Sequence, residues 1–171
     1  MNYLEYATII EKTAVYPKDK AESYLVHGLC GEAGEFIRAW NFGSLEQKCK
    51  ELGDVWWYLT ALAIHYNLIG HLNESIYYTK LAKYPSSNTI FLMMFEEIGV
   101  ISEQTKKYLR DGTEVSIFVP LERIANALKA LGDLAGLSLE VVWQTNYDKL
   151  MKRRQTNTLH GSGDNREEQV A

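Results

Sequence analysis

The sequence predicts an all-α protein, and a few simple observations lead to this expectation. Only three prolines occur among the 171 residues, at positions 17, 85 and 120. Each stands between stretches in which apolar residues recur at three- and four-residue steps. Because proline interrupts helices and this spacing places apolar side chains on one helix face, the pattern is typical of a helical bundle. With 46% hydrophobic and 23% charged residues, the chain can bury the core of one domain.

The expected elements follow in order along the chain. A first helix is closed by the turn before Pro17, and Gly43 and Ser44 are typical of one helix end followed by the N-cap of the next helix. A polar tail after the last helix is expected to be extended or flexible. Helices are therefore expected over 2–14, 22–40, 45–66, 90–109, 121–134 and 139–154, with 67–89 undecided between helix and loop, a turn at 84–88, a folded domain spanning 1–154 and a tail spanning 155–171.

Composition excludes several classes of protein. The chain has 18 basic and 22 acidic residues, a formal net charge of −4, so sequence-independent nucleic-acid binding is not expected. Because no apolar run approaches ~20 residues, neither a membrane span nor a signal peptide is expected. The two cysteines, Cys30 and Cys49, are too few for a disulfide framework or a cysteine-based zinc site. A cytoplasmic location with free thiols fits best.

Two pairs of acidic residues stand out on the second and third expected helices. Glu32 and Glu35 form one pair, Glu51 and Asp54 the other, and each pair is spaced so that both carboxylates share one helix face. If the two helices pack antiparallel across the short connection at 41–44, both pairs converge. Carboxylates held together repel one another, and a hard divalent cation such as Mg²⁺ removes that repulsion.

The alternative for such acids is a solvated helix face, which is the usual explanation for a single pair. Here the pairs are doubled and interleaved with very apolar sequence, which favours a functional site. Gly31, Gly34 and Gly53 flank the acids; each costs helix stability, and each would allow close approach of a facing helix or a ligand.

These segments, GEAGEF at 31–36 and ELGDVWWYL at 51–59, resemble the signature of the MazG-like all-α nucleoside triphosphate pyrophosphatases, which include the dimeric dUTPases and dCTP pyrophosphatases. Residues 13–35, 137–154 and 160–167 are also similar to phage and bacterial members. The resemblance implies a helical bundle of that type and hydrolysis of a nucleoside triphosphate between its α and β phosphates, with Mg²⁺ or Mn²⁺. It also implies a possible homodimer and a role in cleaning or balancing the nucleotide pool.

Carried over residue by residue, the resemblance assigns a role to each matching position. Metal ligation falls to Glu32, Glu35, Glu51 and Asp54, with Glu35 as the base that activates water. Substrate contacts fall to Tyr58 on the third helix and to Asn146, Lys149 and Arg153 on the last one. For the last three the alternative is an ordinary basic helix end. Of Trp40, Trp56 and Trp57, at most one is expected to stack on a base, because tryptophans at helical spacing usually belong to the core.

The second half of the chain looks like a degraded copy of the first. Phe95–Gly112 is similar to the second helix, with Glu97 at the position of Glu32 and Val100 at that of Glu35. In the following helix Glu122 takes the place of Glu51, whereas Ala125 replaces Asp54. We interpret this as a tandem duplication of 20–66 into 90–154, whose copies could form a pseudo-twofold four-helix core.

Two rival functions remain to be weighed. A carboxylate-bridged di-iron bundle needs a histidine three residues after a glutamate. None of the four histidines, His27 included, follows a glutamate at that spacing. The second rival is a non-catalytic helical module that binds nucleotides or a protein partner. Base preference is left open, with a lean toward deoxypyrimidine or damaged nucleotides from the resemblance alone. The tail with Arg166 could fold over phosphate, although a flexible terminus is the simpler interpretation.

Overall fold

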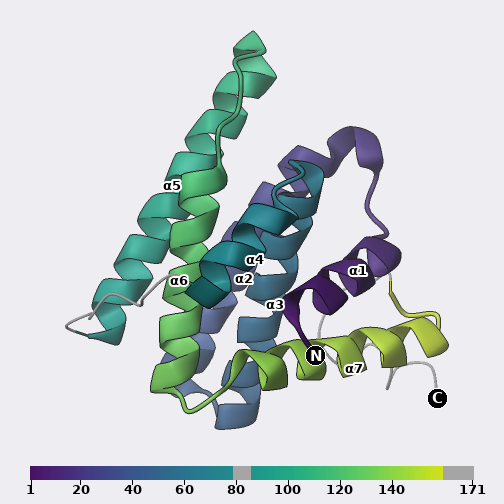
Figure 1. The fold of residues 1–171 in the computed structure, drawn as a ribbon, viewed down its shortest axis with the longest axis vertical. Coiled ribbons are helices and arrows are strands. Elements are labelled where there is room, and N and C mark those ends of the chain that lie inside the picture. Colours follow the sequence, from purple (N-terminus) through teal and green to yellow (C-terminus); the bar gives the residue numbers. More distant parts are fainter. Residues whose placement is uncertain (79–85, 160–171) are drawn as a thin grey trace.

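The computed structural model describes residues 1–78 and 86–159, and these are entirely helical or connecting chain, with no strand (Figure 1). The all-α prediction is confirmed. The helices are α1 (Tyr3–Thr13), α2 (Ala21–Phe42), α3 (Leu45–His65), α4 (Ile69–Tyr78), α5 (Ser87–Asp111), α6 (Phe118–Leu134) and α7 (Leu139–Gln155), with a short 3-10 helix, η1 (Lys18–Lys20), before α2. Part of the turn expected at 84–88, and the tail from His160 with Arg166, lie outside the described residues.

Side-chain caps explain where several helices begin. The side chains of Asn2 and Ser44 each accept a hydrogen bond from the backbone N–H three residues on, and the side chain of that residue accepts one from the cap backbone N–H. Ser86 and Ser138 cap α5 and α7 in the simpler way, by accepting only. At the other end of α5, Gly112 adopts φ +68°, a left-handed conformation that favours glycine.

The undecided segment and two boundaries differ from expectation. Most of 67–78 is helical, as α4, which packs against α6. The two helices after it, α5 and α6, each begin three residues earlier than predicted. For α6 the reason is Pro120, which lies in the first turn, where a missing N–H costs no intrahelical hydrogen bond. Proline there marks the inside of a helix rather than its boundary.

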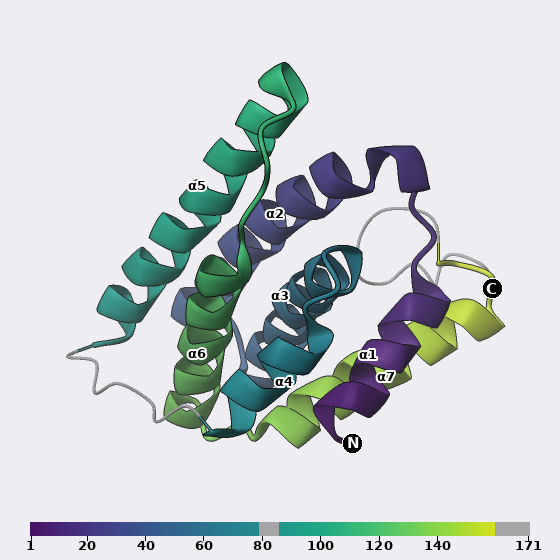
Figure 2. The same ribbon diagram turned by 45° about the horizontal axis from the view of Figure 1, so that its top comes forward.

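Four helices form the central bundle. Helix α2 packs against α3 and α5, and α6 packs against the same two helices, so the four form a closed ring (Figures 1 and 2). Helices α1 and α7 pack against α3 and against each other on one side of this ring. The central helix, α3, thus contacts α1, α2, α4, α6 and α7, and it carries half of the acidic residues of interest. Within the described residues, no helix is long and apolar enough to cross a bilayer.

A cluster of aromatic side chains fastens α1 and α7 to α3. The ring of Trp143 lies 5.6 Å from Trp56, 5.6 Å from Tyr3 and 5.9 Å from Tyr6, and all four residues are fully buried. Buried aromatic pairs of this kind add about 0.5–1.5 kcal/mol beyond the area that they bury. The cluster sets where α7 crosses α3, and therefore where the polar residues of α7 meet the acidic ones of α3.

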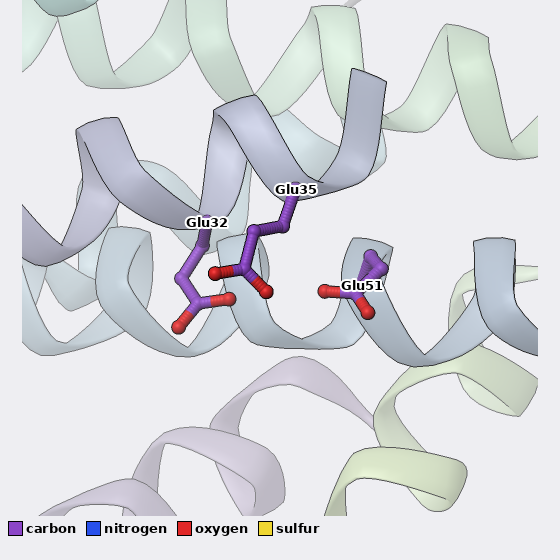
Figure 3. Close-up of side chains that lie close together, drawn as sticks. All are labelled: Glu32, Glu35 and Glu51. Atoms are coloured by element: carbon purple, nitrogen blue, oxygen red, sulfur yellow. The ribbon is translucent and has the colours of Figure 1, made fainter. Parts of the chain in front are cut away.

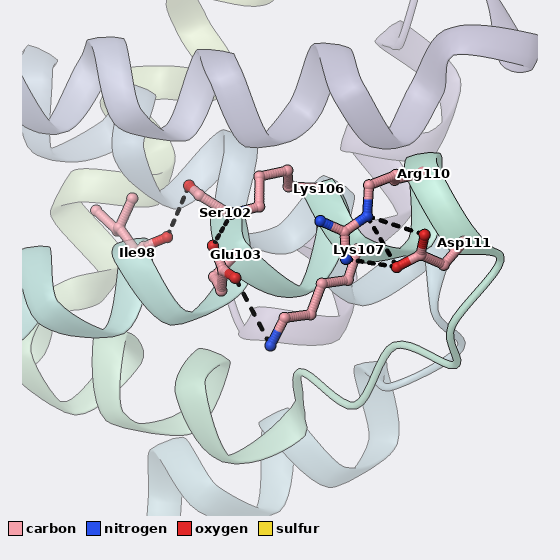
Figure 4. Close-up of polar contacts among 7 residues, drawn as sticks. All are labelled: Ile98, Ser102, Glu103, Lys106, Lys107, Arg110 and Asp111. Atoms are coloured by element: carbon pink, nitrogen blue, oxygen red, sulfur yellow. Dashed lines mark hydrogen bonds and ion pairs between the residues drawn. The ribbon is translucent and has the colours of Figure 1, made fainter.

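The end of α5 carries a solvated ion-pair face (Figure 4). Glu103 pairs with Lys106 and Lys107, and Arg110 pairs with its neighbour Asp111, all with exposed side chains. Such exposed pairs contribute at most about 1 kcal/mol each. This part of the second half is an ordinary charged surface.

Candidate metal centre and pocket

Three of the four predicted acidic ligands come together. Glu32 and Glu35 extend from α2 and Glu51 from α3 into one shared space (Figure 3), where one carboxylate oxygen of each lies within 4.8 Å of the others. The cause is local: one turn separates Glu32 from Glu35 on the same helix face, and the short connection between α2 and α3 brings Glu51 opposite them. The convergence predicted from spacing is present for these three.

The fourth acid, Asp54, is held by α7. Its carboxylate contacts the Lys149 ammonium through both oxygens, and Asn146 Nδ2 donates to Oδ1 at 2.8 Å. Asn146 is 1% exposed, and its Oδ1 accepts from the Tyr6 hydroxyl at 2.8 Å. Both ends of the Asn146 amide therefore take part in hydrogen bonds, and the residue holds Asp54 in position.

Electrostatics reflect the crowding of these acids. Burial, followed by the charges of Asp54 and Glu35, raises the pKa of Glu32 to about 8, while Lys149 acts in the opposite direction. A carboxyl group that keeps its proton near neutral pH is a sign of negative charge without enough compensation. A divalent cation would supply that compensation and displace the proton.

The donor set fits a hard cation. All three clustered ligands are carboxylates, and no histidine or cysteine joins them in the described residues. Oxygen-only sites favour Mg²⁺ or Mn²⁺ over zinc or copper. Glu35 is exposed, which leaves the centre open to solvent and to a ligand. His27 takes no part, since its side chain is exposed and contacts the Ser23 carbonyl.

A cavity of about 370 Å³ opens beside the acids. Part of its lining is acidic, from Glu32, Glu35 and Asp54, and part is aromatic; the two parts are called here the acidic end and the aromatic end. The remaining lining residues are Thr13, Val15, Tyr16, Tyr24, Trp57, Tyr58, Leu150, Arg153 and Leu159. One hollow thus joins a strongly acidic end to an aromatic end, within a single chain.

The aromatic end is built from three segments. Tyr16, in the link between α1 and α2, stacks on Tyr24 with ring centroids 5.2 Å apart and meets Trp57 edge-on at 6.2 Å. Trp57 Nε1 is buried and has no hydrogen-bond partner among the described residues. Of the three tryptophans considered, Trp57 alone lines the cavity: Trp56 is fully buried and Trp40 packs on Phe91 at 5.6 Å.

Tyr58 stands between the two ends of the cavity. Its hydroxyl donates to the Tyr24 hydroxyl at 3.3 Å. Burial, the hydrogen bond to Tyr24 and the nearby acidic charges raise the pKa of Tyr58, so the phenol stays neutral. Its ring fits against α2 only because residue 28 is glycine: a Cβ there would lie 2.0 Å from Tyr58 Cε1.

Of the three glycines that flank the acids, only Gly53 lies close to a facing helix, and close approach of a ligand to the other two stays a prediction. A Cβ on Gly53 would lie 3.0 Å from Asn146 Cβ, so α7 does approach closely there. At Gly31 and Gly34 a Cβ would meet nothing within 4 Å in the described residues, so the prediction of a close helix at these two is wrong. Both positions are exposed on the outer side of α2.

Residues beyond Lys149 also reach the site. Arg153 is 7% exposed and lines the cavity, so it is not part of an ordinary solvated helix end. The sequence predicts an extended chain from Gln155, but the described part of this segment turns back directly after α7. Thr158 is 8% exposed, and its N–H donates to the Arg153 carbonyl at 2.8 Å. Leu159 lines the cavity.

Sequence reasoning missed the cavity contributions of Tyr16, Tyr24 and Leu159. For Tyr16 a signal exists, because an aromatic residue directly before a proline in a short link has no helix face on which to pack. A second hollow of about 410 Å³, lined by Arg38, Phe42 and Glu51 among others, opens on the far side of Glu35. Glu35 thus borders both.

In the second half of the chain, the glutamates at the positions that match Glu32 and Glu51 are paired with other side chains. Glu97 is 8% exposed and accepts a hydrogen bond from Arg123 Nη1 at 2.7 Å, while Glu122 accepts one from Ser75 at 2.8 Å. Glu32, Glu35 and Glu51 form the only cluster of this kind found in the described part of the chain. The second half therefore lacks a comparable acidic centre there.

Comparison of the chain with protein-family models, with curated proteins and with solved structures finds no match in any of the three. We therefore infer function from the site itself.

Proposed function

We propose that the protein is a Mg²⁺-dependent nucleoside triphosphate pyrophosphohydrolase of the MazG-like type, which cleaves a nucleoside or deoxynucleoside triphosphate to the monophosphate and pyrophosphate. One observation carries the proposal: a single cavity is lined by aromatic side chains and by three acids, Glu32, Glu35 and Asp54, of which Glu32 and Glu35 belong to the carboxylate cluster completed by Glu51. Its volume of about 370 Å³ is typical of small-molecule sites. Such an enzyme would clean or balance the nucleotide pool.

A nucleotide matches this division of the cavity. The flat base fits against Tyr16 and Trp57, and the buried indole N–H of Trp57 is a donor that needs an acceptor. The triphosphate then falls at the acidic end, where anions and carboxylates repel unless cations lie between them. The cavity therefore suits a complex of the triphosphate with a metal ion, whereas its carboxylates would repel the bare triphosphate anion.

Each residue then has a defined task. Glu32, Glu35 and Glu51 hold the cation, and Glu35, which borders both hollows, takes the proton from the attacking water. When bound, Mg²⁺, or Mn²⁺ in its place, neutralises phosphate charge and lowers the pKa of coordinated water. The buried Arg153 guanidinium supplies positive charge at the cavity wall.

The test is pyrophosphate release from a panel of canonical and modified triphosphates with Mg²⁺. Glu35→Gln keeps the size of the side chain but removes its basicity, so the rate is expected to fall about 10²- to 10⁴-fold. The matched control is Glu46→Gln, an exposed glutamate on α3 paired with Lys50, which is expected to keep the parent rate. Equal rates in both variants, or no pyrophosphate from any triphosphate, contradict the proposal.

The contact between Asp54 and Lys149 favours one alternative, a non-catalytic nucleotide-binding module, because a site with one acid already neutralised could hold a ligand without reacting. That alternative predicts that triphosphates with Mg²⁺ raise the unfolding temperature while no product forms. The assay above separates the two functions.

A further inference from the structure

The Lys149 ammonium lies beside the acidic residues of the candidate metal centre. It contacts both oxygens of Asp54, the acid that lines the cavity beside Glu32. The side chains of Lys149 and Asp54 are only 10% and 16% exposed, so water screens their attraction poorly. The Asp54 carboxylate thus has a lysine ammonium directly on it.

We propose that Lys149 is a built-in counter-ion that competes with the divalent metal for Asp54 and leaves it when phosphate binds. This inference rests on the metal centre of the proposed function and adds its regulation. The metal-free site has three clustered acids and a fourth that is held by α7. Full ligation requires Lys149 to move.

The surroundings of Asp54 allow that exchange. Asn146 Nδ2 donates to Oδ1 from below and is itself held by Tyr6, so the carboxylate has a fixed anchor that does not depend on Lys149. Lysine carries a compact charge on a flexible four-carbon stem, which can swing to a new partner without movement of the helix. Asp54 can therefore stay in place while the Lys149 ammonium moves to another partner.

A phosphate group is the partner that draws Lys149 away. In the proposed function the triphosphate binds in the cavity beside Asp54. The negative charge of the triphosphate exceeds that of one carboxylate. Once Lys149 turns to phosphate, Asp54 is free for the metal, so each ligand strengthens binding of the other. This coupling is reciprocal by thermodynamic necessity.

The second half of the chain shows the contrasting arrangement. Glu97 pairs there with Arg123, whose guanidinium is charged at all pH values of interest, and no cluster of acids lies beside it in the described residues. A carboxylate that has a permanent partner and belongs to no such cluster has no use for a metal. Lys149 differs because it lies beside an acidic cluster. A metal ion that displaces Lys149 from Asp54 also gains the three clustered carboxylates as ligands.

The first experiment measures Mn²⁺ binding by calorimetry in the absence of nucleotide. Lys149→Gln removes the competing charge and is expected to tighten Mn²⁺ binding about tenfold. Lys149→Arg keeps the charge and is expected to bind Mn²⁺ no more tightly than the parent protein. Lys152→Gln, an exposed lysine on the same helix, makes the same change in net charge and is expected to alter the affinity less than about twofold.

A second measurement uses the parent protein and needs no variant to fold. Inorganic phosphate is expected to tighten Mn²⁺ binding relative to chloride at equal ionic strength, and this gain is expected to vanish in Lys149→Gln. Unchanged or weaker Mn²⁺ binding in a folded Lys149→Gln, or no effect of phosphate on the parent, overturns the competition while leaving the metal centre in place. Absence of Mn²⁺ binding to the parent overturns the centre and the proposed function together.

Discussion

At the scale of single residues, carboxylates from matching pairs end in different surroundings. Glu32 and Asp54 belong to equivalent pairs in the sequence, yet Glu32 keeps a raised pKa among other acids while Asp54 is neutralised by Lys149. The spacing of each pair predicts a shared helix face and nothing about the third helix that packs on it. Lys149 lies 95 residues from Asp54 in the chain, so no local pattern could reveal their contact.

Glu32 leads to a prediction about pH. Its pKa rises from 4.5 to about 8 on folding, so between these values the folded chain holds a proton that the unfolded chain has lost. The contribution of Glu32 to stability is therefore complete below about pH 4.5 and is lost as the pH rises toward 8. Without divalent metal, Glu32→Gln is expected to be more stable than the parent at pH 8 by about 1–2 kcal/mol, allowing for partial solvent screening.

Urea unfolding at pH 4, 6 and 8 in the presence of a chelator checks this. The gain is expected to disappear near pH 4, where both states of the parent protein carry the proton. A constant difference across this range would show that Glu32 does not titrate as described.

At the scale of elements, most helices could be predicted because each carries its own signal. Caps at Ser44 and Ser138 and the low proline content placed α2, α3 and α7 to within a few residues. The sequence leaves the α4 segment open between helix and loop, because polar residues are mixed with its apolar and aromatic ones. The crossing of α7 over α3 depends on Trp143 meeting Trp56, a contact between residues that no local spacing connects.

The packing of α2 against α3 gives a second prediction. Gly28 leaves the notch into which the Tyr58 ring fits, so Gly28→Ala forces that ring out of place and is expected to destabilise the fold by about 1–3 kcal/mol. Gly31→Ala, on the same helix but facing open space, is the matched control and is expected to stabilise by up to about 1 kcal/mol.

Unfolding free energies from urea titrations of the two variants provide the comparison, and the Michaelis constant for a cleaved triphosphate provides a second readout. Because Tyr58 forms the middle of the cavity wall, Gly28→Ala is also expected to raise that constant, whereas Gly31→Ala leaves it unchanged. Equal stability of the two variants would mean that the notch is not needed.

At the scale of the whole molecule, the chain combines two helix pairs in one ring and places its acidic centre in the first pair alone, as far as the structure describes it. The ring agrees with the four-helix core expected from the apparent repeat, and we retain the duplication as a proposal. The cavity could not be predicted, because its lining combines the α1–α2 link, α2, α3, α7 and the segment after α7. A homodimer is also retained as a proposal.

The central claim is that this cavity cleaves a triphosphate between its α and β phosphates with a divalent metal. Phosphorus NMR of the products formed from a triphosphate and Mg²⁺ tests it most directly. We predict signals of a nucleoside monophosphate and pyrophosphate in equal amounts, and none when the metal is chelated. Orthophosphate with a nucleoside diphosphate, or turnover that persists without metal, would contradict the account.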